Sequence, residues 1–245
     1  MKNILVAKFY KLTEAFFCYD DMDIISSRYE QACNLLVDSA KKYLYDIDKI
    51  VINRHTVRHD QEMFLHHAEL LKDLYHSGDY NILYCDLDMV FVKPTRIFGE
   101  YNNFSMCQGN CGVRYYPAGG MTDQQWQTQA EWVSNWQTEF SKKDDRIHNW
   151  QYEQEMYNAM HDLAKHKFVN PFGPVVHNMY NHPSEEYSLV HCCGTSQQFD
   201  GLKLQKELFE LSLQGKHSEI HSKLQDPLYS TITEDRNGAP WLGLT

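Results

Sequence analysis

Residues 79–94 have the sequence Asp-Tyr-Asn-Ile-Leu-Tyr-Cys-Asp-Leu-Asp-Met-Val-Phe-Val-Lys-Pro, and they give the clearest indication of the fold class. Apolar residues fill positions 82–85 and 89–92. A short apolar run after a Gly-Asp turn signal predicts a buried strand of an α/β sheet. Such sheets bind ligands outside the carboxyl ends of their strands. This strand ends where Asp86 and Asp88 appear, one residue apart.

The two carboxylates predict a divalent-cation site. An unpaired buried carboxylate is very costly, and Mg²⁺ takes one or two protein carboxylates while leaving its other positions to substrate phosphates and water. Mn²⁺ accepts the same oxygens and also tolerates an imidazole. The alternative is that Asp86 and Asp88 form a solvated turn, because Asp-x-Asp alone is a common pattern.

The composition is that of an ordinary soluble globular protein. The chain has 245 residues, of which 42% are hydrophobic and 23% charged, enough for one large domain or two small ones. The net charge of −10 argues against a general nucleic-acid binder, although it leaves room for a local basic patch. No stretch approaches the length of a transmembrane helix, and the start is too short and too charged for a signal peptide. Seven scattered cysteines predict reduced thiols in a cytoplasmic protein.

Hydrophobic periodicity predicts alternating strands and helices before the central strand. We expect strands at 3–9 and 47–52, and helices at 22–43 and 57–76. This order favours a parallel, doubly wound sheet with right-handed crossovers. Later short extended segments are predicted at 104–107, 112–116, 168–170, 175–179 and 187–191, and helices at 123–140, 150–163 and 200–214. The remaining residues, with several Pro, Asn and Gly, predict an irregular tail.

Four short motifs occur in an order that resembles GT-A glycosyltransferases of family 8 and related families, which use nucleotide-sugar donors. They are Asp-x-Asp at 86–88, Asn-Cys-Gly-Val at 110–113, Glu-Gln at 153–154 followed by Asn158, and His-Cys-Cys-Gly at 191–194. Their order and spacing together carry the resemblance. It implies an α/β, Rossmann-like GT-A fold, with a doubly wound, mainly parallel sheet flanked by helices. We expect this single catalytic domain to span residues 1–200, with residues 201–245 packed on it as a helix and tail.

The resemblance also implies the metal ligands. His191 would be the third protein ligand of an ion held by Asp88, with Asp86 binding either the ion or the donor ribose. Gly194 belongs to the same His-x-x-Gly element and is expected to contact the donor. The alternative is that His191 is a hydrogen-bonded core histidine.

The donor and acceptor pocket is predicted from five residues. Asn110 and Gly112 would line the donor-sugar pocket, and Glu153 would face the sugar or the acceptor hydroxyl. Phe9 and Tyr10, at the end of the first strand, would hold the base and ribose. The alternatives are a hairpin turn at Asn110, an ordinary exposed carboxylate at Glu153, and core aromatics at Phe9 and Tyr10.

The sequence departs from the family after the His-x-x-Gly element. The family often continues with Lys-Pro-Trp, whose lysine would touch the diphosphate, whereas Ser-Gln-Gln follows here at 196–198. Lys203 and Arg114 are the candidate substitutes for that contact.

We therefore expect a metal-dependent hexosyl- or pentosyltransferase that uses Mn²⁺ or Mg²⁺ and a nucleotide-diphosphate sugar, a UDP-sugar. Retention is expected because the Asn110 and His191 elements resemble retaining families. The acceptor would be a glycan or another hydroxyl compound, and the negative charge disfavours a nucleic acid. Alternatives are an inverting GT-A enzyme, a nucleotidyltransferase or sugar-nucleotide synthase, and a non-catalytic lectin-like protein. The synthase is disfavoured because residues 9–20 contain no Gly, and the lectin-like protein because Asp86, Asp88 and His191 are all intact.

Overall fold

The computed structural model describes residues 1–12, 22–57, 60–107, 110–139, 149–162, 176–177, 187–192 and 201–225. The chain divides into two compact units that are interleaved along the sequence. Unit 1 comprises Met1–Glu30, Asp46–Leu87 and Arg96–Phe172, and unit 2 comprises Gln31–Tyr45, Asp88–Thr95 and Gly173–Thr245. The helices that follow residue 200 therefore belong with the segment that follows Leu87.

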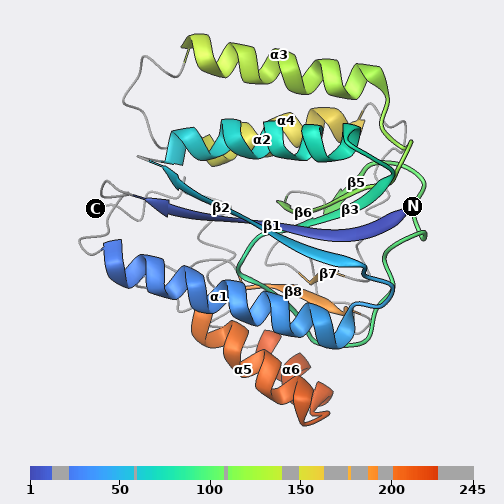
Figure 1. The fold of residues 1–245 in the computed structure, drawn as a ribbon. Helices are drawn as coiled ribbons and strands as arrows, with labels where there is room; N and C mark the ends of the chain where they lie inside the picture. The colour runs from blue at the N-terminus through green and yellow to red at the C-terminus, as the bar shows by residue number, and fades with distance from the viewer. Residues whose placement is uncertain are drawn as a thin grey trace. The chain divides into compact units, whose positions relative to one another are not determined.

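Unit 1 is built on a five-stranded sheet of order β2-β1-β3-β6-β5 (Figure 1). Its strands are β1 (Lys2–Leu12), β2 (Lys49–Val57), β3 (Tyr80–Cys85), β5 (Ser105–Cys107) and β6 (Asn110–Tyr116). Strand β1 pairs in parallel with β2 and β3, whereas β6 pairs antiparallel with β3 and β5. The predicted parallel arrangement of the first three strands is confirmed, and two antiparallel strands extend it into a mixed sheet.

The connections between the parallel strands explain the doubly wound topology. Helix α1 (Met22–Tyr43) links β1 to β2, and α2 (Asp60–His76) links β2 to β3. Because β1 lies between β2 and β3, the two connections run in opposite directions across the sheet. Within unit 1, α2, α3 (Asp123–Glu139) and α4 (Asn149–Asp162) lie on one side of the sheet, with α3 outermost (Figure 1).

One face of this sheet carries the hydrophobic core of unit 1. Ile4 pairs with Ile82 and Val6 pairs with Tyr84 in the parallel register, so these four side chains share a face. All three helices contribute buried side chains to the same cluster: Leu71, Trp126, Trp136, Met156, Tyr157 and Met160. Beyond Val6 and Tyr84, toward the carboxyl ends of the strands, the side chains on this face become charged.

Unit 2 contains a three-stranded sheet of order β4-β8-β7. Its strands are β4 (Met89–Phe91), β7 (Val176–His177) and β8 (Leu189–His191), and β8 runs antiparallel to β4 and parallel to β7. Helix α5 (Gly201–Leu213) buries Leu204 and Leu208 in the cluster of this unit, and Leu211 packs partly buried against it. The inward face predicted for this helix is confirmed.

The prediction of an irregular tail after residue 214 is wrong for its first part. Residues His217–Leu224 form helix α6. Gly215 has a φ of 71° and lets the chain turn between α5 and α6. Ile220 and Leu224, one helical turn apart, are buried in the cluster of unit 2. This tertiary burial stabilises a short helix that its local sequence signals only weakly. The extended segment predicted at 168–170 and the tail beyond 225 lie outside the described residues.

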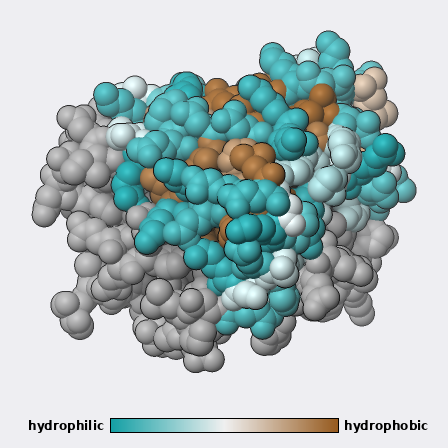
Figure 2. All heavy atoms as spheres, turned by 90° about the horizontal axis from the view of Figure 1, so that it is seen from below, coloured by the Kyte–Doolittle hydropathy of each residue, from teal (hydrophilic) through white to brown (hydrophobic). Residues whose placement is uncertain are grey.

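None of the helices described above is both long and apolar enough to cross a membrane. The face drawn in Figure 2 is mainly hydrophilic where it is coloured, with small hydrophobic patches between polar side chains. In the described ranges, the large hydrophobic side chains that are exposed are those of Met1, Tyr45 and Leu213. Isolated side chains of this kind are normal on a protein surface.

Gln205 offers a test of how α5 is held within unit 2. Its side chain is fully buried, and Nε2 donates to the carbonyl oxygens of Ala32 at 3.2 Å and Met89 at 2.8 Å. Gln205→Ala leaves buried carbonyls without this donor, so we expect the free energy of unfolding to fall by about 1–3 kcal/mol in urea denaturation. The control Lys206→Ala, at the exposed next position, should change it by less than about 0.5 kcal/mol. Equal losses in the two variants would contradict the anchoring role.

Candidate functional site

Asp88 and His191 meet at one end of the β4–β8 ladder in unit 2. Asp88 directly precedes β4, and the ladder begins with the pair Met89 and His191. The backbone N–H of Cys192 donates to the carbonyl oxygen of Asp88 at 2.8 Å, and Nε2 of His191 lies 3.0 Å from Oδ1 of Asp88. Two side chains that are 103 positions apart in the sequence are thus brought into contact.

Asp86 adds a second carboxylate close to this pair. It directly follows β3 and precedes Asp88 by two residues, so chain connectivity keeps the two carboxylates near each other. One possible ligand atom from each of Asp86, Asp88 and His191 lies within 4.8 Å of the other two. Both carboxylates are partly exposed, whereas His191 is buried.

The donor set fits a divalent cation. Two carboxylates and one imidazole are ligands that Mn²⁺ accepts, and Mg²⁺ binds the same carboxylate oxygens. Adjacent ligands of an octahedral ion with bonds of roughly 2.1 Å lie roughly 3.0 Å apart, and the Asp88 and His191 atoms are 3.0 Å apart. These two side chains can therefore occupy neighbouring coordination positions.

Asp86 is held in place from within unit 1. Its backbone N–H donates to the carbonyl oxygen of Gly112 at 2.7 Å, and the hydroxyl of Tyr84 donates to its Oδ1. Burial, and then the charge of Asp86, raise the pKa of Tyr84 well above its usual value. The phenol therefore stays protonated and remains a hydrogen-bond donor to the carboxylate. Gly112, predicted for the donor-sugar pocket, thus pairs with the backbone of Asp86.

Glu153 of α4 lies between two cations. Nζ of Lys8 is 3.4 Å from both of its oxygens, and Nη1 of Arg114 donates to Oε1 at 3.4 Å. Burial raises the pKa of Glu153, but the nearby Lys8 and Arg114 outweigh burial and hold the pKa below its usual value. The carboxylate therefore stays ionised at neutral pH and is a weak base.

The next residue of the same motif fixes α4 to the sheet. Oε1 of Gln154 accepts a hydrogen bond from the backbone N–H of Cys111 at 2.6 Å, and its Nε2 donates to Oδ1 of Asn158 at 3.0 Å. Gln154 and Asn158 share a helix face at i and i+4. The Glu-Gln and Asn elements thus hold the helix against β6.

Phe9 and Tyr10 lie near the carboxyl end of β1, and both are buried. The guanidinium of Arg54 lies 4.6 Å from the centroid of the Phe9 ring, and the ring of Tyr10 stacks on His55 with centroids 6.1 Å apart. Burial, and then the charge of Glu153, raise the pKa of Tyr10. Their burial favours the core interpretation, and their role toward a nucleotide stays a prediction.

The remaining predicted residues are less informative. Asn110 begins β6, and its side chain lies outside the described part, as does Gly194. Lys203 is exposed on α5, and its contact with the diphosphate stays a prediction. Arg114 is fully buried, with its guanidinium carbon 4.0 Å from the ring centroid of Tyr84 and 3.7 Å from that of Tyr157. A guanidinium enclosed in this way does not reach a diphosphate, so that suggestion is wrong.

Two residues of this region, Lys8 and Tyr84, are not among those predicted from the sequence. A signal for both was present in the strand alternation, because residues i and i+2 of a strand point to the same face. Tyr84 therefore shares a face with Asp86, and Lys8 follows Val6 on that face. Which partner each of them meets depends on α4, whose position no local pattern specifies.

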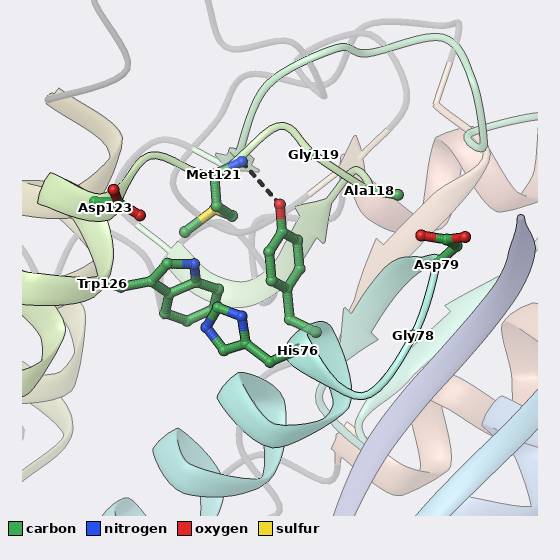
Figure 3. Close-up of a pocket in the computed structure, with 9 residues that line it drawn as sticks. His76, Gly78, Asp79, Ala118, Gly119, Met121, Asp123 and Trp126 are labelled. Atoms are coloured by element: carbon green, nitrogen blue, oxygen red, sulfur yellow. Dashed lines mark hydrogen bonds between the residues drawn. The ribbon is translucent and has the colours of Figure 1, made fainter.

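A separate hollow of about 400 Å³ lies at the other edge of unit 1 (Figure 3). Its lining includes the rings of Tyr75, His76 and Trp126, with centroids 5.1–5.5 Å apart. It also includes Asp79, which precedes β3, so this hollow lies at the amino end of that strand. Ligands of α/β sheets bind at the carboxyl ends of the strands, which favours the Asp86 end as the candidate site.

No family model matches the chain, and no curated protein matches it by sequence. Solved structures do resemble it. One is a glycosyltransferase involved in the glycosylation of the major capsid of PBCV-1, with a TM-score of 0.50 and 11% sequence identity, over 87% of this chain and 100% of that one. Another is the glycosyltransferase GlyE of Streptococcus pneumoniae TIGR4, with a TM-score of 0.43 and 14% identity, over 91% of this chain and 64% of that one.

The first of these likenesses establishes the fold. At 11% identity it shows a shared architecture and no more, and that architecture agrees with the five-stranded sheet and its flanking helices. The predicted glycosyltransferase fold class is therefore confirmed.

The ionised state of Glu153 gives a test by pH. Because its pKa is lowered in the folded state, its contribution to stability is present above the unfolded pKa of about 4.3 and is lost as the pH falls through the folded pKa. Glu153→Gln leaves buried Arg114 without this counter-charge, so we expect the free energy of unfolding at pH 7 to fall by up to about 3–5 kcal/mol. The difference in unfolding free energy between Glu153→Gln and the protein without substitutions should shrink as the pH falls below about 4.

Glu155→Gln, at an exposed position of the same helix, is the matched control. It removes the same charge without uncovering Arg114, and it should leave the unfolding free energy within about 0.5 kcal/mol. A difference for Glu153→Gln that is independent of pH between 3 and 7 would contradict the ion-pair interpretation.

Proposed function

We propose that this protein is a metal-dependent glycosyltransferase that transfers a sugar from a nucleotide-diphosphate donor, a UDP-sugar, to an acceptor hydroxyl with retention. The observation that carries the proposal is the convergence of Asp86, Asp88 and His191 within 4.8 Å, directly after the central strand of a glycosyltransferase fold. Carboxyl ends of parallel strands are where α/β folds place their ligands. The fold alone would not carry a function, because one fold hosts many activities.

In this proposal the three converging side chains bind Mn²⁺ or Mg²⁺. When bound, the ion supplies positive charge that offsets the negative charge growing on the leaving diphosphate. Asp88 and His191 would occupy adjacent positions around it, since their atoms are already 3.0 Å apart. Asp86, held by Tyr84 and Gly112, would bind the ion or the donor ribose.

Glu153 and Asn110 are proposed to orient the sugar or the acceptor hydroxyl. A carboxylate fixed by Lys8 and Arg114 can accept a hydrogen bond from a hydroxyl and hold it near the reacting carbon. Its negative charge also favours the positive charge that develops on the sugar in an oxocarbenium-like state.

The lowered pKa of Glu153 supports retention. Inverting transfer needs a general base opposite the leaving group, and an effective base has a pKa near the working pH. A carboxylate whose pKa is held below its usual value is a poor base. We therefore propose that Glu153 positions groups and is not an obligatory base. An acceptor of the glycan class and a cytoplasmic location, expected from the sequence, belong to the same proposal.

Metal-dependent donor binding is the direct test. UDP should bind in isothermal titration calorimetry when Mn²⁺ is present and much more weakly without it. Asp88→Ala removes one ligand and should abolish the Mn²⁺-dependent part of UDP binding. His191→Ala should lower the affinity for Mn²⁺ by about 10–100-fold. This measurement also separates a transferase from a lectin-like protein that binds no nucleotide.

The controls for these variants are Asp73→Ala on α2 and His217→Ala on α6, which remove the same chemical groups outside the cluster. Both should leave Mn²⁺ and UDP affinity unchanged. Unaltered Mn²⁺-dependent UDP binding in Asp88→Ala would remove the basis of the metal site.

Retention predicts that the product keeps the anomeric configuration of the donor. Proton NMR of the products from a UDP-sugar reaction reads this configuration directly from the anomeric coupling constant. Hydrolysis in the absence of an acceptor gives the same readout if it is followed before the free sugar mutarotates. An inverted product, together with lost activity in Glu153→Gln, would refute retention while leaving the fold and the metal site intact.

A further inference from the structure

In unit 1, a group of buried side chains packs together next to Asp86. Tyr84 is fully buried, and its hydroxyl donates to Oδ1 of Asp86. Both residues lie on the same sheet face, two positions apart along one stretch of chain. The hydroxyl therefore reaches the carboxylate without any bend in the strand, provided that the ring of Tyr84 is held in one orientation.

Arg114 holds that ring. It pairs with Tyr84 across the β3–β6 ladder, and its guanidinium carbon lies 4.0 Å from the Tyr84 ring centroid. On α4, Tyr157 packs against the same guanidinium, with its ring centroid at 3.7 Å. A planar guanidinium stacks well on aromatic faces, so Arg114 and two tyrosines form a closed stack.

Two further contacts keep this stack from moving. Nη1 of Arg114 donates to Glu153 at 3.4 Å, so the buried cation has a counter-charge. Nζ of Lys8 lies 5.9 Å from the centroid of the Tyr84 ring and is paired with the same Glu153. These contacts restrain the ring of Tyr84 and, with it, the direction of its hydroxyl.

We propose that Tyr84 is a positioning residue that orients Asp86 for a divalent cation, and that Arg114 acts through Tyr84. An aspartate side chain can rotate about two bonds, and a carboxylate anchored at one oxygen presents its second oxygen in a defined direction. Carboxylates that ligate metals are commonly hydrogen-bonded in this way, and loss of such a partner weakens metal binding. The inference rests on the proposed function, because the cation is the one assigned there to the Asp86, Asp88 and His191 cluster.

The test uses the full chain and Mn²⁺ alone, without nucleotide. Tyr84→Phe removes only the hydroxyl and keeps the ring in the stack. Electron paramagnetic resonance of free Mn²⁺ gives the dissociation constant, and we expect Mn²⁺ to bind about 10-fold more weakly. The control is Tyr115→Phe, which removes the hydroxyl of another fully buried tyrosine, one that accepts a hydrogen bond from the backbone of Gly99 at 3.2 Å. Its Mn²⁺ affinity should not change.

Metal affinity and stability separate positioning from a merely structural role. Thermal unfolding midpoints of Tyr84→Phe and Tyr115→Phe should be similar, while only the former loses Mn²⁺ affinity. If the two variants lose Mn²⁺ affinity equally, or if neither does, the proposal is overturned.

Arg114→Lys keeps the positive charge and loses the planar stack. If Arg114 acts through Tyr84, Arg114→Lys should weaken Mn²⁺ binding on its own, and the double variant should bind Mn²⁺ no more weakly than Tyr84→Phe alone. Additive losses would show that Arg114 acts independently of Tyr84. Should Arg114→Lys fail to fold, Tyr84→Phe and its control still decide the role of Tyr84. If the protein without substitutions binds no Mn²⁺, both the proposed function and this inference are refuted. If Tyr84→Phe binds Mn²⁺ normally, only the inference is refuted.

Discussion

The buried guanidinium of Arg114 is the constraint on which unit 1 depends. A fully buried cation is unfavourable unless it is paired and hydrogen-bonded, and its neighbours provide both conditions. Glu153 supplies the opposite charge and accepts a hydrogen bond from Nη1, and the rings of Tyr84 and Tyr157 lie against the guanidinium at 4.0 and 3.7 Å. Because Glu153 and Tyr157 both belong to α4, satisfying Arg114 fixes where that helix sits on the sheet.

The sheet face that carries Arg114 has two zones, one apolar and one charged. Near the amino ends of the parallel strands the face is apolar, and it packs against the helices through residues such as Ile4 and Ile82. Near the carboxyl ends it carries Lys8, Arg114 and Asp86, with Glu153 above them. A charged zone of this kind is unfavourable for stability alone, since apolar side chains of similar volume often serve a core as well or better. This zone lies at the edge where α/β sheets generally bind their ligands, which fits the role proposed for these charges.

Much of the architecture follows from local sequence patterns. The apolar spacing of residues 22–43 predicts α1 at its observed bounds, and the short apolar run before Asp86 predicts β3. The two-residue period of the strands is strong enough to place Tyr84 and Asp86 on one face. Helix α6 was missed because its burial depends on Ile220 and Leu224 meeting a cluster formed mostly by distant residues.

Local patterns in the sequence predict the order of the elements, the parallel pairing of the first strands, and the types of side chain found in the Asp86, Asp88 and His191 cluster. These properties are encoded locally, by hydrophobic period and by residue chemistry at short spacing. No local pattern joins His191 to Asp88: the family resemblance alone implied their proximity, and strand pairing across 103 positions of the fold brings the two side chains into contact. Only the tertiary structure decided that Arg114 is enclosed and that Glu153 lies between two cations. A charged residue looks the same in sequence whether it is solvated or buried, and only its neighbours in space determine its pKa and its role.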